Sequence, residues 1–289
     1  NPYLRLRDST GTQIAAYDDG GAGVNSRGQF TAATGGTYYL AASSYDPDLV
    51  GSYQLSVTDL TPATTLPNQQ LLSAASYILR STTGAAVSDI AQKLAAGVLT
   101  TTTMIGELIK AADATTSVAT LSYEFFTGKI PSQGGIDYLV STSGGNANNL
   151  NSSYYQAFSM ENRYINFAVN LGAVGEGRSA FQVGYGHLTL LEATKQAYNT
   201  IFGSAPTDAK AHALIDTRAD YFAAYGGDGV TGLGTKAAMV GWLLAEAAKA
   251  DLGIYSKSND AFLTDLADGA TFAVDIIGVY GRPEYIFLG

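Results

Sequence analysis

The sequence has no cysteine. This absence excludes a disulfide framework and a thiolate metal site, so stability must come from packing or from hard cations held by oxygen ligands. Because the chain is acidic and attracts divalent cations, calcium is the cofactor that we consider.

Charge is scarce and mostly negative. Charged residues make up 14% of the sequence, and the formal net charge of −9, without a basic stripe, repels nucleic acid, which is therefore excluded as a partner. No apolar run is long enough to span a bilayer, so no membrane-spanning segment is expected. Glycine, serine, threonine, asparagine and 19 tyrosines are abundant, as in secreted and cell-surface bacterial proteins. We expect an extracellular, cell-surface location.

Catalytic signatures are also missing. The two histidines, His187 and His212, form no HExxH pair, and no serine-triad or phosphate-loop motif occurs. We therefore expect no active site in this chain. One enzymatic alternative stays open, in which Glu124 acts with Glu161 or Asp137 as a glycosidase pair, although a glutamate at such a position more often caps or pairs on a helix surface.

The first 60 residues have the pattern of β-strands. In YLRLR (residues 3–7) leucines alternate with arginines, DSTG makes a turn, and TQIAAY (12–17) extends again, which predicts a hairpin. Turns rich in glycine or containing Asp-Pro separate further segments in the rhythm of an antiparallel sandwich. Further strands are expected at residues 27–32, 36–43 and 51–57. The chain starts without Met and inside a strand, so we expect this sandwich to be N-terminally incomplete.

From residue 69 the apolar spacing becomes that of helices, after a linker over residues 61–68 that carries proline and threonine. Most of the expected helices follow Thr, Ser, Asp or Asn and many end at Gly, the usual capping residues. About eight are expected, at residues 69–81, 85–99, 101–126, 152–172, 189–203, 207–226, 235–253 and 259–281. The predicted fold is thus multidomain α and β: a small antiparallel β-sandwich over residues 1–60 and an all-α domain over residues 69–289.

Acidic and amide side chains gather in YDDGGAGVNS, residues 17–26. Their oxygen atoms surround flexible glycines and suit calcium, which takes about six to eight oxygen ligands. The candidate metal ligands are Asp18, Asp19, Asn25 and Ser26. The alternative is an ordinary Asp/Gly hairpin loop with solvated charges, and for a second acidic pair, Asp46 and Asp48, a turn is the favoured interpretation.

The stretch LNSSYYQAFSMENRYINF, residues 150–167, brings tyrosines and planar polar groups together. As one helix from about Ser152 it places apolar side chains on one face, which is the pattern of a core stripe. Carbohydrate sites, in contrast, combine exposed aromatic rings with amide and guanidinium groups, and this stretch has both. The candidate sugar-binding residues are Tyr154, Tyr155, Asn162, Arg163 and Asn166. On spacing alone both interpretations stay open.

The strand segments NPYLRLRDSTG, IAAYDDGGAGVNSR, GTYYLAAS and GSYQLSV resemble the bacterial pre-peptidase C-terminal domain, a small β-sandwich appended to secreted proteases. Order and spacing both match over most of residues 1–58. Asn1 stands where that family often has Asp. The resemblance implies that the chain is attached to a secreted protease.

The helical part resembles the N-terminal anchoring domain of the caulobacterial S-layer protein, from about residue 69 to 270. The similarity is strongest in TTSVATLSYEFFTGKIPSQGGIDYLVST, NNLNSSYYQAFSMENRYINFAVNLG and ATKQAYNTIFG. It implies a helical module that binds the O-antigen of lipopolysaccharide at the outer membrane, in a calcium-dependent structure.

Together the two resemblances imply a non-catalytic cell-surface anchoring region of a secreted metalloprotease, similar to the S-layer-associated serralysin-type enzymes. The zinc-containing catalytic domain is expected upstream of Asn1, and lipopolysaccharide O-antigen is the expected partner. The alternative is a protein-docking module that recruits the protease to S-layer subunits. Alanine-rich helices such as TKAAMVGWLLAEAAKA keep this alternative open, because docking would bury an aliphatic patch.

Overall fold

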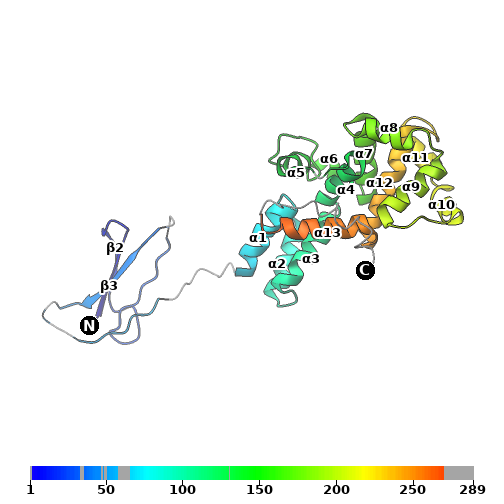
Figure 1. Ribbon diagram of the computed structural model, residues 1–289. Coiled ribbons are helices and arrows are strands. Elements are labelled where there is room, and N and C mark those ends of the chain that lie inside the picture. Colours follow the sequence, from blue (N-terminus) through cyan, green and yellow to red (C-terminus); the bar gives the residue numbers. More distant parts are fainter. Residues whose placement is uncertain are drawn as a thin grey trace. The chain divides into compact units, whose positions relative to one another are not determined.

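The computed structural model describes residues 2–32, 36–46, 48, 51–57, 66–129 and 131–269. The chain divides into two compact units, Asn1–Ala63 and Thr64–Gly289 (Figure 1). Asn1, linker residues 61–65 and the part of the predicted helical domain beyond residue 269 lie outside the described residues. The first helix begins at Leu66, inside the segment that the sequence predicts as linker.

The N-terminal unit is built on a three-stranded antiparallel sheet. Its strands are β1 (Pro2–Arg7), β2 (Gln13–Tyr17) and β3 (Tyr39–Ser44), and β1 lies in the middle, paired with both others. Leu6 lies opposite Ala15 on one side and Leu40 on the other, so one face of the sheet is apolar. The predicted hairpin of the first two strands is confirmed.

Residues 27–32 and 51–57, which the sequence predicts as strands, lie outside this sheet, and that prediction is wrong. Gly28 packs flat on the ring of Tyr17, since an added Cβ atom would stand 2.3 Å from the ring. The Tyr17 hydroxyl donates to the Gln29 carbonyl oxygen at 2.9 Å. The first segment therefore crosses a side chain of β2 instead of pairing with a strand, and residues 51–57 are exposed throughout.

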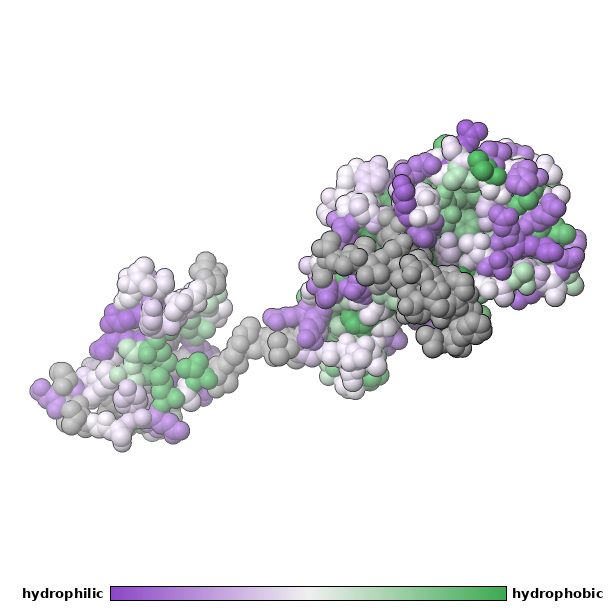
Figure 2. Space-filling view, in the orientation of Figure 1, coloured by the Kyte–Doolittle hydropathy of each residue, from purple (hydrophilic) through white to green (hydrophobic). Residues whose placement is uncertain are grey.

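The N-terminal unit has a small core. Among its described residues, Leu6 is the one apolar side chain that is buried. Several large apolar side chains are exposed: Ile14, Val24, Phe30, Leu55 and Val57. Figure 2 shows hydrophobic residues on the visible face of this unit. Because stabilisation by apolar burial scales with the area removed from water, the helical unit gains far more from it.

The second unit is all-α and contains thirteen α-helices in its described residues, with one π-helical turn. They are α1 (Leu66–Ile78), α2 (Ala85–Ala95), α3 (Thr101–Ala112), α4 (Thr116–Thr127), α5 (Gln133–Val140), α6 (Ser153–Gln156), α7 (Met160–Val169), η1 (Asn170–Val174), α8 (Arg178–Tyr185), α9 (Leu190–Phe202), α10 (Asp208–Ile215), α11 (Ala219–Gly226), α12 (Leu233–Ala250) and α13 (Ile254–Leu266). A small antiparallel β unit followed by an all-α domain is the predicted layout, and it is confirmed. In this part of the chain no helix is long and apolar enough to cross a membrane.

The expectation of about eight helices is too low for two reasons. Three of the predicted helices are each divided in two, and two further short helices were not predicted. The break between α3 and α4 falls at residues 113–115, where Thr115 leaves helical geometry, and the break between α10 and α11 falls at residues 216–218. The stretch 152–172 also divides, as described below. The two short helices, α5 and α8, have eight residues each, so few apolar positions repeat along them.

Capping residues delimit the helices much as predicted. At the start of α9 the Thr189 side chain accepts from the Glu192 N–H, and the Glu192 carboxylate accepts from the Thr189 N–H, which is a capping box. The helix ends at Gly203, whose φ of 82° is the left-handed geometry that glycine adopts without a steric penalty.

Helix α12 is the centre of the helical unit. It packs against α7, α9 and α11, and its residues from 234 to 248 are buried, apart from Glu246 (Figure 1). A helix that is apolar all round has to be covered on every side. At the crossing with α7, a Cβ atom added to Gly241 would stand 2.6 Å from the Tyr164 carbonyl oxygen and 2.8 Å from the Ala168 Cβ atom. The two backbones therefore touch where α12 has no side chain.

Two Gly→Ala substitutions, one at this crossing and one away from it, should have opposite effects on stability. Gly241→Ala should lower the free energy of unfolding by about 1–3 kcal/mol, because the methyl group forces α7 and α12 apart. Gly106→Ala, at an exposed position inside α3 with nothing within 4 Å, should raise it by about 0.5–1 kcal/mol through better helix propensity. Urea unfolding followed by circular dichroism measures both. A stable Gly241→Ala would contradict the close crossing.

Candidate functional site

Residues 150–167 fold as two helices at an angle, so the prediction of one continuous helix from Ser152 is wrong. Helix α6 stops at Gln156, where the Phe158 N–H donates to the Tyr155 carbonyl oxygen at 3.0 Å. Ser159 then starts α7 as its N-cap, since its hydroxyl accepts from the Asn162 N–H at 3.3 Å. The turn brings the aromatic side chains of α6 beside the polar face of α7.

Three aromatic rings cluster at this turn. The Tyr154 ring lies edge-on to the rings of Tyr155 and Phe158, at centroid distances of 5.1 and 5.2 Å. Tyr154 is 47% exposed, whereas Tyr155 is only 5% exposed. The expectation of exposed rings therefore holds for Tyr154, and Tyr155 belongs to the core beneath it.

An asparagine ladder runs along α7 next to these rings. Asn162, Asn166 and Asn170 follow one another at four-residue spacing, which places them on one helix face. The Asn166 side-chain oxygen accepts from the Tyr155 hydroxyl at 2.8 Å and from the Asn170 amide at 3.1 Å. Burial is the main cause that raises the pKa of Tyr155, so its hydroxyl stays a donor at neutral pH.

Tyr221 fixes the first asparagine of the ladder from the neighbouring helix α11. Its hydroxyl lies 2.6 Å from the Asn162 side-chain oxygen and 3.2 Å from the Glu161 carboxylate. Burial and then the Glu161 charge raise the pKa of Tyr221. With the Asn162 and Asn166 oxygens occupied, their amide N–H groups have no acceptor among the described residues and remain donors for a ligand.

Arg163 is buried, at 8% exposure, and does not present its guanidinium on the surface as the sequence predicts. It donates from Nε to the Phe158 carbonyl oxygen at 3.2 Å, from Nη1 to the Ala114 carbonyl oxygen at 2.8 Å and from Nη2 to the Gln156 side-chain oxygen at 3.3 Å. The planar fork thus ties the α6–α7 turn to the segment between α3 and α4. Burial lowers the pKa of Arg163.

The face that results is only partly exposed and differs from the predicted set. We name it the α6–α7 surface, and its members are Tyr154, Phe158, Asn162, Asn166 and Asn170. Sequence reasoning missed Asn170 and the supporting Tyr221. The four-residue spacing of the ladder was a readable signal for Asn170, whereas Tyr221 lies 59 residues from Asn162 and gave none.

The carboxylates of the enzymatic alternative lie on three different helices with different partners. Glu161 on α7 accepts from Tyr221, and Asp137 on α5 forms an ion pair with Arg80 at 3.3 Å. Glu124 is buried within α4. His212 pairs along its own helix with Asp216 at 3.0 Å. Glu161, Asp137 and His212 thus each have a structural partner.

The loop of residues 17–26 holds its candidate ligands in a turn. The Asn25 amide donates to the Ala22 carbonyl oxygen at 3.0 Å, the Ser26 hydroxyl donates to the Pro2 carbonyl oxygen, and the Asp19 N–H donates to the Asp18 carboxylate at 3.1 Å. The carboxylates and the Asn25 oxygen therefore keep accepting capacity. Within the described ranges no three His, Cys, Asp or Glu side chains are placed to share a metal ion, so an ion here would also need carbonyl oxygens and water. Asp46 accepts from the Asp48 N–H at 3.0 Å, as in a turn.

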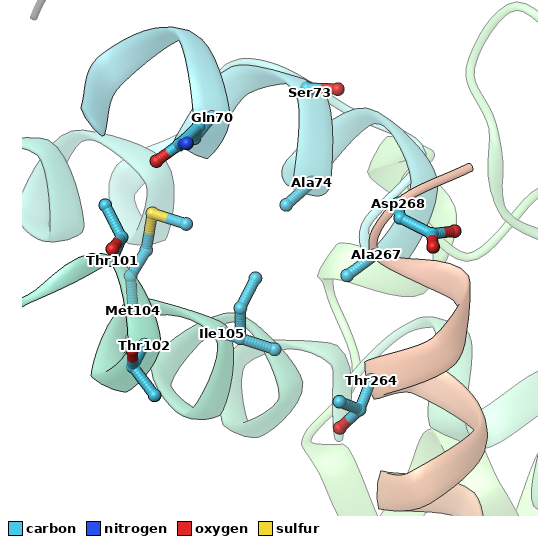
Figure 3. Close-up of a pocket in the computed structure, with 10 residues that line it drawn as sticks. All are labelled: Gln70, Ser73, Ala74, Thr101, Thr102, Met104, Ile105, Thr264, Ala267 and Asp268. Atoms are coloured by element: carbon cyan, nitrogen blue, oxygen red, sulfur yellow. The ribbon is translucent and has the colours of Figure 1, made fainter. Parts of the chain in front are cut away.

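A cavity of about 400 Å³ lies among α1, α3 and the end of α13 (Figure 3). Met104, Ile105 and Ala74 supply apolar atoms, and hydroxyl and amide groups surround them. The polar lining residues are Gln70, Ser73, Thr101, Thr102, Thr264 and Asp268. The sequence gave no signal for this cavity, because the three helices that form it are far apart along the chain.

The Arg163 contacts predict a loss of stability when the planar fork is removed. Arg163→Lys should lower the free energy of unfolding by about 1–3 kcal/mol, because one ammonium group leaves buried acceptors unpaired. Arg178→Lys, at an exposed position of α8, should change it by less than about 0.5 kcal/mol. Urea unfolding compares the two, and equal effects would contradict the structural role of Arg163.

Comparison with known proteins identifies the family to which the helical unit is similar. The model of the RsaA N-terminal domain family matches residues 115–288, which is more than half of the chain. The match begins at the start of α4 and includes the whole α6–α7 surface. The sequence has no match among the curated proteins. The chain belongs to the RsaA N-terminal domain family.

Proposed function

We propose that this chain anchors its parent protein to the O-antigen of lipopolysaccharide, and that the α6–α7 surface contacts the sugar. Its family is that of an S-layer protein's N-terminal domain, which associates such a chain with the S-layer at the cell surface. The observation that carries the proposal is the exposed Tyr154 ring packed on Tyr155, the residue whose hydroxyl holds the side-chain oxygen of Asn166.

The chemistry of the α6–α7 surface suits a neutral saccharide. An aromatic ring packs against the C–H face of a sugar, and amide N–H groups donate to hydroxyl and carbonyl oxygens. The ladder amides are pre-positioned by Tyr155 and Tyr221, so little side-chain entropy is lost on binding. A polymer with many repeats compensates for weak individual contacts through multivalency.

Arg163 enters this proposal as a positioning residue. Its three acceptors hold the α6–α7 turn closed, so the Tyr154 ring and the ladder keep their spacing. Tyr155 acts in the same way through Asn166. The proposed contact set is therefore Tyr154 with Asn162 and Asn166, and the buried pair supports it.

The parent protein in this proposal is a secreted metalloprotease whose catalytic domain lies outside this chain. The support is the resemblance of residues 1–58 to the pre-peptidase C-terminal domain. The anchor would then keep the protease at the cell surface. Detection of one polypeptide that contains both this chain and a zinc-dependent protease domain, by mass spectrometry of cell-surface protein, would test this part separately.

The first test is binding to smooth lipopolysaccharide beside rough lipopolysaccharide, which lacks O-antigen. Tyr154→Ala should weaken binding to a short O-antigen fragment about tenfold, because an aromatic contact contributes roughly 1–1.5 kcal/mol. Tyr138→Ala, which removes a 55% exposed tyrosine of α5, should leave binding unchanged. Isothermal titration calorimetry measures the affinities, and circular dichroism confirms the fold of both variants.

Two results would overturn the anchoring proposal. Equal binding to smooth and rough lipopolysaccharide would remove O-antigen as the ligand. If the chain binds S-layer subunits and lipopolysaccharide does not inhibit this binding, the docking alternative is favoured instead. On the visible face of the helical unit, hydrophilic and hydrophobic residues are interspersed (Figure 2), and the exposed side chains of Val98, Val174, Val183 and Leu252 lie in four separate segments of the chain.

Calcium at the 17–26 loop is the cofactor in this proposal, because Asp18 and Asp19 stand side by side next to backbone carbonyls. When calcium is added to chelator-treated chain, the double variant Asp18→Asn/Asp19→Asn should bind one calcium ion fewer than the original chain. Asp46→Asn/Asp48→Asn is the matched control, since that pair forms a turn. Calorimetric titration with calcium measures the difference, and identical isotherms for the variant and the original chain would exclude this loop.

A further inference from the structure

One face of the N-terminal sheet carries tyrosines and arginines. Alternation along β1 places Tyr3, Arg5 and Arg7 on the same face. Across the ladder, Tyr39 of β3 shares this face because it lies opposite Arg7. Tyr45 follows β3, and its ring meets the Tyr3 ring edge-on at a centroid distance of 5.8 Å. We name this the tyrosine–arginine face, and its members are Tyr3, Arg5, Arg7, Tyr39, Ser43 and Tyr45.

The opposite face of the sheet is apolar and is covered by the segment that follows β2. Leu6 and Tyr17 lie on that side, and Gly28 packs flat on the Tyr17 ring. The tyrosine–arginine face, in contrast, is open to solvent, since the side chains of Tyr39 and Tyr45 are 54% and 63% exposed. The unit thus buries its leucines on one side and presents aromatic rings on the other.

The arginines of this face are fixed by neighbouring groups. The guanidinium carbon of Arg5 lies 4.6 Å from the centroid of the Tyr3 ring, and its Nη1 donates to the Ser43 hydroxyl at 3.0 Å. Arg7 donates from Nη1 to the Gly11 carbonyl oxygen at 2.8 Å. The other N–H groups of both planar forks have no acceptor among the described residues and remain donors for a ligand.

The positive charge of this face is not neutralised by acidic side chains. None of the ion pairs in the part of the chain that the structure describes includes Arg5 or Arg7. The three strands contain no aspartate or glutamate, and the acidic residues that follow them, Asp8, Asp18 and Asp46, lie in turns. The face is therefore positive in a chain whose net charge is −9, and it attracts an anionic ligand.

We propose that the tyrosine–arginine face binds an acidic saccharide, a linear glycan whose sugar rings carry carboxylate groups. Exposed tyrosine rings pack against the C–H faces of sugars, and a guanidinium group donates two parallel hydrogen bonds to a carboxylate. Tyr39 starts β3 and Tyr45 follows its end, so at the rise of an extended chain they stand about 20 Å apart. A glycan of several sugars reaches both rings and passes the arginines between them.

An acidic peptide is the competing ligand, and the arrangement disfavours it. A sheet binds an extended peptide mainly through the backbone groups of an edge strand, which here are those of β2 and β3. The members of the tyrosine–arginine face project out of the sheet plane instead, and they supply rings and planar donors. This face therefore suits a saccharide. It belongs to a different unit from the α6–α7 surface and does not depend on the anchoring proposal.

The test is calorimetric titration of the full chain with a hexamer of galacturonic acid, beside a neutral hexamer of glucose and a hexamer of glutamate. The galacturonate hexamer should bind and the other two should not. Arg5→Gln should weaken this binding about tenfold, because hydrogen bonds to a charged group are lost. Tyr39→Ala, at an exposed position, should weaken it about fivefold through loss of an aromatic contact.

Two variants outside the face are matched controls. Arg27→Gln removes the same charge at an exposed position after β2, and Tyr53→Ala removes a 67% exposed tyrosine outside the sheet. Both should bind the galacturonate hexamer as the original chain does, and so should Tyr154→Ala in the helical unit. Amide spectra by NMR confirm that the sheet of each variant is folded, and if Arg5→Gln fails to fold, Tyr39→Ala decides.

Three results would overturn the saccharide site. The first is that the galacturonate hexamer does not bind, and the second is that the glucose hexamer binds equally well. The third is that the glutamate hexamer binds and loses affinity in Tyr39→Ala, because the face would then recognise an acidic peptide. Equal weakening in Arg27→Gln would also contradict the proposal, since it would reduce the effect to net charge.

Discussion

The backbone contact between α7 and α12 at Gly241 is the constraint on which the rest of the helical unit depends. With no side chain at this point, the two helices approach until the Cβ position of residue 241 lies 2.6 Å from the Tyr164 carbonyl oxygen. This places α7 in one position against the central helix. The asparagine ladder and Arg163, which the proposed sugar surface depends on, both lie on α7.

Few charges are present in this chain, and two of the buried ones serve backbone carbonyls. Arg163 donates to carbonyl oxygens before and beneath α7, and Lys236, at 1% exposure, donates to the Tyr185 and Gly186 carbonyl oxygens at 3.0 and 3.1 Å where α8 ends. A cation at a helix C-terminus meets the negative end of the helix dipole as well as unpaired carbonyls. Burial of these cations is therefore offset mainly by backbone carbonyl groups.

The sequence predicts well what depends on neighbours along the chain. Alternating apolar residues identify β1 to β3, and the Thr189 and Gly203 caps mark the ends of α9, because the groups involved are within a few residues of one another. The sequence does not predict the position of a side chain that depends on contact with a segment farther along the chain. Tyr155 on α6 and Arg163 on α7 have the side-chain chemistry of a sugar site, yet they point inward, to Asn166 and to the Ala114 carbonyl oxygen. Tyr221 was unreadable for the same reason, since it lies 59 residues from the Asn162 that it contacts.

The α6–α7 surface is built from uncharged side chains. A neutral sugar is recognised by rings and amides, whose contacts do not depend on pH or salt, so Tyr154 and the ladder gain nothing from charge. Arg163 holds this surface in place through three acceptors, and the next residue, Tyr164, has the carbonyl oxygen that faces Gly241. The fork that fixes the α6–α7 turn and the backbone contact that fixes α7 against α12 therefore come from consecutive residues of one helix.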